Sequence, residues 1–155
     1  MRRSSRSKAG GAFSLVEAAL AAVIVGTGIV AVVASLGAGA RMNDAGRNLT
    51  EAVFLAEEMR EWTVQLPFTE ANGGTSLSSL YAAGGTTYSP PINGMGQTIS
   101  GMTDWSQVLT LSWADPNNLT STLSPNASSV IRASVSVRFQ GAQVLAVSWL
   151  EANRI

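Results

Sequence analysis

The feature that most constrains this chain is a run of 23 uncharged residues, Ala18 to Ala40, directly behind a single carboxylate, Glu17. A helix of about 20 mostly apolar residues is long enough to cross the hydrocarbon core of a bilayer. The run is therefore predicted to span a membrane. A carboxylate at the edge of such a segment is costly to place there, and it indicates a functional role for Glu17 rather than a packing role.

The segment before this run is basic. Residues 1–12 carry four positive side chains and end in the small residues Gly10, Gly11 and Ala12. Such a segment is typical of a processed leader peptide and is excluded from the fold. Because basic residues favour the cytoplasmic side of a membrane, the leader is expected in the cytoplasm and residues 41–155 outside it.

Removal of the leader changes the charge balance. The whole chain has ten Lys and Arg against ten Asp and Glu, and loss of the four basic leader residues leaves a net charge of about −4. An acidic body has no basic patch to neutralise phosphates, which argues against nucleic-acid binding. The chain also lacks cysteine and histidine, so thiolate chemistry and the commonest general base and metal ligand are excluded.

The residues GGAFSLVEAAL at the junction of leader and apolar run resemble the class III signal sequence of type IV pilins and of the pseudopilins of type II secretion. The resemblance implies cleavage by a prepilin peptidase before Phe13 and methylation of the new amine of Phe13. It implies a role in assembly for Glu17, four residues after Phe13. The family cleaves after glycine, whereas Ala12 stands between Gly11 and Phe13 here, so cleavage after Gly11 stays open beside cleavage after Ala12.

The same resemblance implies a structural subunit and no enzyme, with no cofactor and no metal. Its partners would be the prepilin peptidase, other pilin or pseudopilin subunits, an inner-membrane assembly platform and the lipid bilayer. The subunit would lie in the bacterial inner membrane as a single-pass protein, with its C-terminal domain periplasmic or extracellular, and would enter a pilus or pseudopilus on assembly. The short body and the segment LAEEMREW look most like the minor members of the family.

Beyond the apolar run, residues 41–66 are predicted to continue the helix of residues 13–40 as an amphipathic segment. Apolar and small residues recur at steps of three and four, while glutamates collect on the opposite side; the proposed apolar stripe is Leu49, Ala52, Leu55, Ala56, Met59, Trp62, Thr63 and Leu66. Pro67 disfavours helical geometry at Leu66 and is expected to end the helix. Phe54 falls on the acidic side, either as a singly exposed aromatic or as a contact with a neighbouring subunit.

The remainder divides into two regions. Residues 67–104 are rich in Gly, Pro and Ser and are predicted to be loop with short ordered pieces. Residues 105–155 show the alternation of strands at Leu109–Trp113, Ile131–Phe139 and Val144–Leu150. The predicted fold class is α+β, a long N-terminal helix packed on a small antiparallel sheet of about three strands.

Two other interpretations stay open. The chain can be a single-span membrane-anchored envelope protein whose β-rich domain binds something without polymerising, in which case residues 1–12 are retained. It can also be a conventional secreted protein cut after Ala38-Gly39-Ala40, although the apolar run is longer than the 7–15 residues usual for such a signal. A run of oxygen-bearing residues, 115–118, offers ligands for Ca²⁺ but reads more readily as a turn.

Overall fold

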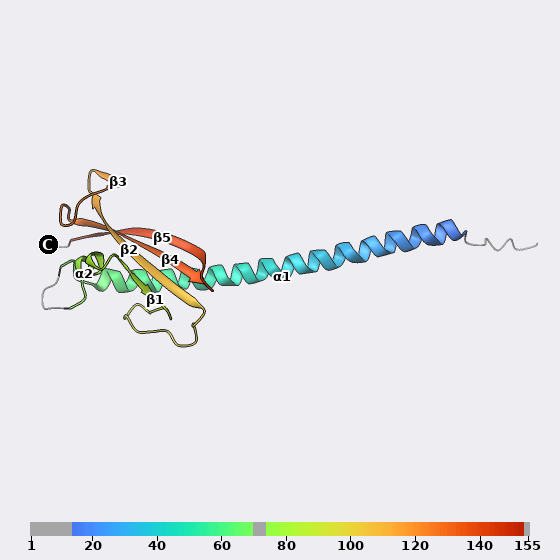
Figure 1. The fold of residues 1–155 in the computed structure, drawn as a ribbon, viewed down its shortest axis with the longest axis horizontal. Coiled ribbons are helices and arrows are strands. Elements are labelled where there is room, and N and C mark those ends of the chain that lie inside the picture. The colour runs from blue at the N-terminus through green and yellow to red at the C-terminus, as the bar shows by residue number, and fades with distance from the viewer. Residues whose placement is uncertain (1–13, 70–73, 154–155) are drawn as a thin grey trace, which may run out of the picture. The chain divides into compact units, whose positions relative to one another are not determined.

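A computed structural model of the chain describes residues 14–69 and 74–153. The chain forms two compact units, residues 1–44 and 45–155, and one helix contributes residues to both. Figure 1 labels the elements, which in chain order are α1 (Leu15–Gln65), α2 (Leu77–Ala82), β1 (Thr86–Tyr88), β2 (Trp105–Asp115), β3 (Asn118–Thr122), β4 (Val130–Phe139) and β5 (Ala142–Ala152).

In the N-terminal unit, the described residues from Leu15 onward are helical and every residue from Ser14 to Asp44 is exposed. The helix can continue through this stretch because it holds no proline and contains many alanines, the strongest helix formers. No described residue of the chain therefore shields the apolar run from its surroundings.

In the C-terminal unit, one stripe of α1 packs on the sheet. Its buried members lie at helical spacing and are Ala52, Leu55, Ala56, Met59 and Thr63. The predicted stripe is thus largely confirmed, with one correction, since Leu49 is 47% exposed and lies outside the buried set. The helix ends at Gln65, where Leu66 N–H turns back to the carbonyl of Thr63 (3.1 Å) immediately before Pro67.

The sheet is antiparallel and has five strands, not the three predicted from the sequence. Its main order is β1-β2-β4-β5, and β3 pairs with the end of β2. The two additional strands have only three and five residues, and β3 is almost entirely polar, so neither produces a readable apolar alternation. The three predicted strands are present and longer than expected, which confirms the α+β class.

In the central strands β2 and β4, the apolar side chains that alternate with polar ones are those that face the core. In β4 the buried side chains are Ile131, Ala133, Val135 and Val137, and in β2 the buried row contains Leu109, Leu111 and Trp113. These side chains join the α1 stripe in one core. The strand β5 is less completely covered, because Val147, which pairs with Val135, is still 39% exposed.

The region 67–104 is ordered at its contacts with the core. Here α2 begins at the capping residue Ser76, whose hydroxyl accepts the backbone N–H of Ser79 at 3.1 Å, and buries Leu77 and Leu80 beneath it. This short helix escaped the sequence prediction, because six residues are too few to show a helical period.

A buried glutamine joins three segments of the C-terminal unit. Gln107 Nε2 donates to the carbonyl of Leu55 in α1 (2.7 Å) and to that of Ile92 (3.2 Å), and its Oε1 accepts the N–H of Ile92 (2.8 Å). The side-chain amide therefore pairs with both backbone groups of Ile92, as a strand residue would. It fixes the segment that follows β1 against both the sheet and the helix, and it leaves no polar group of its own unsatisfied.

We expect the fragment 45–155 to fold alone and to lose its fold on the substitution Val135→Asp. Val135 is 1% exposed, so the change buries an unpaired carboxylate at a cost of several kcal/mol. Thermal unfolding followed by circular dichroism tests this, with the exposed Ala146→Asp as the control on β5. Equal melting temperatures for the two variants would contradict the facing of β4.

Gln107→Leu is expected to loosen the segment around Ile92 before the rest of the sheet. The substitution leaves the N–H and C=O of Ile92 buried without the partners described above, at about 1–3 kcal/mol for each group. Urea unfolding measures the loss, and amide hydrogen exchange locates it. The same change at the exposed Gln65 is the control. Equal exchange rates at Ile92 in the two variants would contradict the role of Gln107 in fixing this segment.

Candidate functional site

The first candidate site lies at the beginning of α1. Ser14 caps the helix, since its hydroxyl accepts the N–H of Glu17 (3.2 Å) and its carbonyl accepts the N–H of Ala18 (3.1 Å). Glu17 therefore occupies the first turn, where a negative charge interacts favourably with the N-terminal end of the helix dipole. The other predicted processing residues, Gly11, Ala12 and Phe13, lie outside the described residues.

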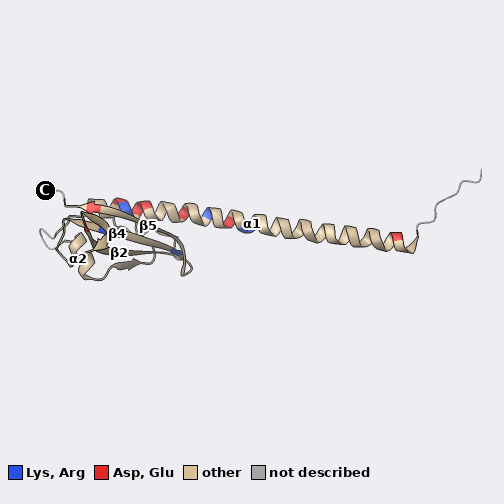
Figure 2. Ribbon diagram, turned by 90° about the horizontal axis from the view of Figure 1, so that it is seen from above, with Lys and Arg blue, Asp and Glu red and all other residues tan. Residues whose placement is uncertain are grey.

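Behind Glu17, α1 presents an apolar surface on all sides. Figure 2 shows one acidic position near the start of the helix, then a long uncharged stretch, then a series of charged positions. The exposed large side chains of the stretch are Leu20, Val23, Ile24, Val25, Ile29, Val30, Val32, Val33 and Leu36, and Leu15 and Val16 are exposed just before Glu17. By length and composition this helix is able to cross a membrane.

One of the two hydroxyl side chains within this stretch, that of Thr27, is satisfied locally. Thr27 Oγ1 donates to the carbonyls of Val23 (2.9 Å) and Ile24 (3.0 Å), so its hydroxyl needs no partner from the surroundings. Internal pairing of this kind is what a low-dielectric environment requires of a hydroxyl. The exposed hydroxyl of Thr27 is therefore compatible with contact with hydrocarbon.

A second exposed surface lies on the part of α1 that belongs to the C-terminal unit. Phe54 is 49% exposed and neighbours the exposed Val53, so the predicted exposure of Phe54 is confirmed. Two ion pairs bracket it, Arg47 with Glu51 at 3.0 Å and Arg60 with Glu57 at 3.6 Å. Such exposed pairs contribute little to stability, because water and salt screen them.

The acidic side of α1 also contacts the loop that contains Gly94 and Gly96, and the sequence did not predict this contact. Glu58 Oε2 accepts the N–H of Gly94 at 2.6 Å. At Gly96, whose φ is +76°, a Cβ would lie 2.7 Å from Nε1 of Trp62, so only glycine fits there. The contact was missed because it joins residues 36 positions apart, and no short motif signals it.

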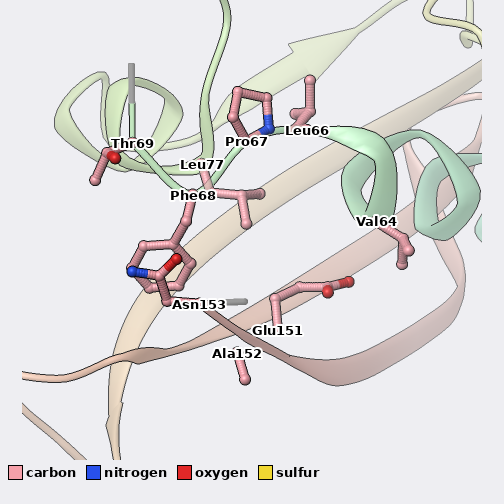
Figure 3. A pocket seen from close by; sticks show the side chains of 9 residues that line it. All are labelled: Val64, Leu66, Pro67, Phe68, Thr69, Leu77, Glu151, Ala152 and Asn153. Carbon is pink, nitrogen blue, oxygen red and sulfur yellow. The ribbon is translucent and has the colours of Figure 1, made fainter. Parts of the chain in front are cut away.

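The cavity drawn in Figure 3 lies in the C-terminal unit, where the end of α1, the segment after it, the start of α2 and the end of β5 meet. It measures about 350 Å³, and its lining consists of Val64, Leu66, Pro67, Phe68, Thr69, Leu77, Glu151, Ala152 and Asn153. Among the described residues of this lining, Glu151 is the one ionisable side chain.

The remaining titratable groups of the described residues bear on two questions, a metal-binding cluster and perturbed pKa values. Within residues 14–69 and 74–153, no cluster of three or more Asp, Glu, His or Cys side chains is placed to hold a metal ion. Burial raises the pKa of Tyr88 above its usual value of 10.0, partly offset by its hydrogen bond with Thr86. The phenol therefore stays protonated at neutral pH, where its ring packs edge-to-face on Trp62 at 5.6 Å.

No protein-family model matches the chain, and neither a curated protein nor a solved structure shows significant similarity to it. The long apolar N-terminal helix and the antiparallel sheet on which its later part packs are compatible with a pilin-like fold.

Proposed function

We propose that the protein is a prepilin-like structural subunit. A prepilin peptidase removes residues 1–12 and methylates the amine of Phe13, and the subunit then assembles through its N-terminal helix into a type IV pilus or a type II secretion pseudopilus as a minor component. Before assembly it is held in the bacterial inner membrane, with residues 41–155 outside the cytoplasm.

The observation that carries this proposal is the pairing of the GGAFSLVEAAL motif with a helix that begins at Leu15 and exposes its apolar residues on every side. A conventional anchor also needs an apolar helix, but it has no use for a carboxylate in the first helical turn. A filament subunit uses both, because the helix leaves lipid for the apolar core of a filament and the carboxylate needs a cation there.

The cation in this proposal is the amine of Phe13 on a neighbouring subunit. At a separation of 4 Å and an effective dielectric of about 20, opposite unit charges attract by about 4 kcal/mol before desolvation is subtracted. Pairing with Glu17 would satisfy a carboxylate that is costly in an apolar filament core. It would also fix the axial stagger between neighbouring helices, since only one stagger brings the two charges together.

The second candidate is a single-span envelope protein with a non-polymerising binding domain. The exposed surface around Phe54 and the cavity beside Glu151 favour it, because each offers a contact surface in the C-terminal unit. It differs from the first candidate in processing and in its need for Glu17.

Intact-mass measurement of the membrane-extracted protein is expected to give a chain that begins at Phe13 with one additional methyl group. A strain that lacks prepilin peptidase is the control, and there the leader should remain. A mass with residues 1–12 present in the strain with active peptidase would support the non-polymerising anchor, and a chain that begins at Arg41 would support the secreted protein.

Glu17→Leu is expected to leave membrane insertion and leader removal intact and to reduce co-purification with partner pilins at least tenfold. The reason is that the change removes the partner of the Phe13 amine, an interaction of the size estimated above, and each 1.4 kcal/mol corresponds to a factor of ten. Glu17→Asp should retain part of the assembly. Glu57→Leu, at an exposed position of the C-terminal unit, is the matched control. Normal co-purification of the Glu17→Leu chain would refute the assigned role.

A further inference from the structure

A recess lies between the acidic side of α1 and the loop that contains Gly94, within the C-terminal unit. It measures about 280 Å³, and its lining consists of Glu58, Glu61, Gln65, Asn93, Gly94 and Met95. Two carboxylates, two side-chain amides and a thioether therefore meet in one place, and the Met95 side chain is 73% exposed. Acceptor oxygens beside an apolar side chain suit a group with an aliphatic stem and a cationic end that donates hydrogen bonds.

Glu61 is the carboxylate of this recess that stays available to such a group. Glu58 already accepts the N–H of Gly94, at 2.6 Å. Gly94 also packs closely on Glu61, since a Cβ at position 94 would lie 3.1 Å from Oε2 of Glu61. Among the described residues, Glu61 makes neither a hydrogen bond nor an ion pair. The recess therefore presents an unneutralised negative charge beside a second one.

The unneutralised positive charges of the same unit lie on the other face of the sheet. Arg47 and Arg60 pair with glutamates of α1 itself. Arg132 and Arg138 of β4 make no ion pair with any residue that the structure describes. Both alternate with the buried residues of β4, so they lie on the sheet face turned away from α1. Figure 2 shows this division, with acidic positions along the last part of α1 and basic positions on the sheet.

We propose that the recess binds Arg138 of a second copy of this chain. Arg138 is the exposed one of the two β4 arginines, and it stands two residues before the turn at Gln140. Its guanidinium pairs with the carboxylate of Glu61, and its aliphatic stem lies against Met95. The inference deepens the proposed function, because it names a partner for the C-terminal unit, and it rests on that function for the filament that results.

One copy cannot form this pair by itself. The sheet separates the two groups, since α1 packs on one face and Arg138 lies on the other. Two copies in the same orientation instead bring the outer sheet face of one copy against the α1 side of the next. Such a contact is heterologous, so each added copy offers a new recess or a new arginine and the chain of copies stays open. A twofold pair that stacks equal faces would bring like charges together.

Exchange of the two charges tests the proposal. Full chains with two different affinity tags are produced together, extracted in mild detergent and purified by one tag, and the second tag reports the bound copies. The variants are Glu61→Arg, Arg138→Glu and the chain that carries both changes. Arg132→Glu, on the same face of the same strand, is the matched control. The strain lacks prepilin peptidase, so assembly of the processed N-terminal helix does not contribute to the signal.

We expect each single exchange to lower the co-purified fraction about fivefold, because it places like charges in contact, and the double exchange to restore that fraction to within about twofold. Arg132→Glu should stay near the original chain. Both exchanged positions are exposed, so the melting temperatures should not change.

Three results would overturn the proposal: no co-purification of the original chain, no restoration by the double exchange, or an equal loss with Arg132→Glu. Unchanged co-purification of the single variants would do the same. Failure of the proposed function shows itself elsewhere, as retention of residues 1–12 in a strain with active peptidase, and it leaves the charge-exchange result as expected.

Discussion

Burial of one sheet face by one helix is the interaction on which the C-terminal unit depends. The sheet is a single layer, so the inward side chains of β2 and β4 can leave water only against α1 and the segments beside it. Leu55 and Met59 are completely buried in that contact. Because α1 supplies the cover and also carries the apolar stretch of the N-terminal unit, the same element that makes the body stable also supplies the candidate membrane span.

The long elements could be predicted from the amino-acid pattern because each has a strong physical signal. Pro67 removes helical freedom from Leu66, and α1 ends one residue earlier. In β4, polar residues alternate with apolar ones over the nine positions 131–139, and four of the five apolar side chains are buried. The Glu17 prediction rests on a different signal, the cost of a charge beside an apolar run, and the structure places this residue in the first turn of an exposed helix. Its assembly role remains a prediction.

The features that could not be predicted are short or depend on contacts distant in sequence. The strands β1 and β3 and the helix α2 are each six residues or fewer, which is below the length at which a period can be read. Gln107 occupies an inward position in β2, where a polar residue reads as an interruption of the apolar row. Its partners lie 15 and 52 positions away, so only the folded chain shows that it is satisfied. The prediction that Leu49 belongs to the buried stripe was wrong, since this side chain is 47% exposed.

The three-way contact of Gln107 has a consequence for the order in which the chain acquires structure. Helix formation and closure of the hairpin between β4 and β5 are local events, whereas the bond from Gln107 to the carbonyl of Leu55 can form only after α1 has docked on β2. The segment around Ile92 also contacts α1 through the bond from Gly94 to Glu58, so its full set of contacts exists only when that docking is complete. Residues 90–102 are expected to join the fold late, on a surface that earlier steps have already built, so changes in this loop act mainly on how fast the folded chain opens.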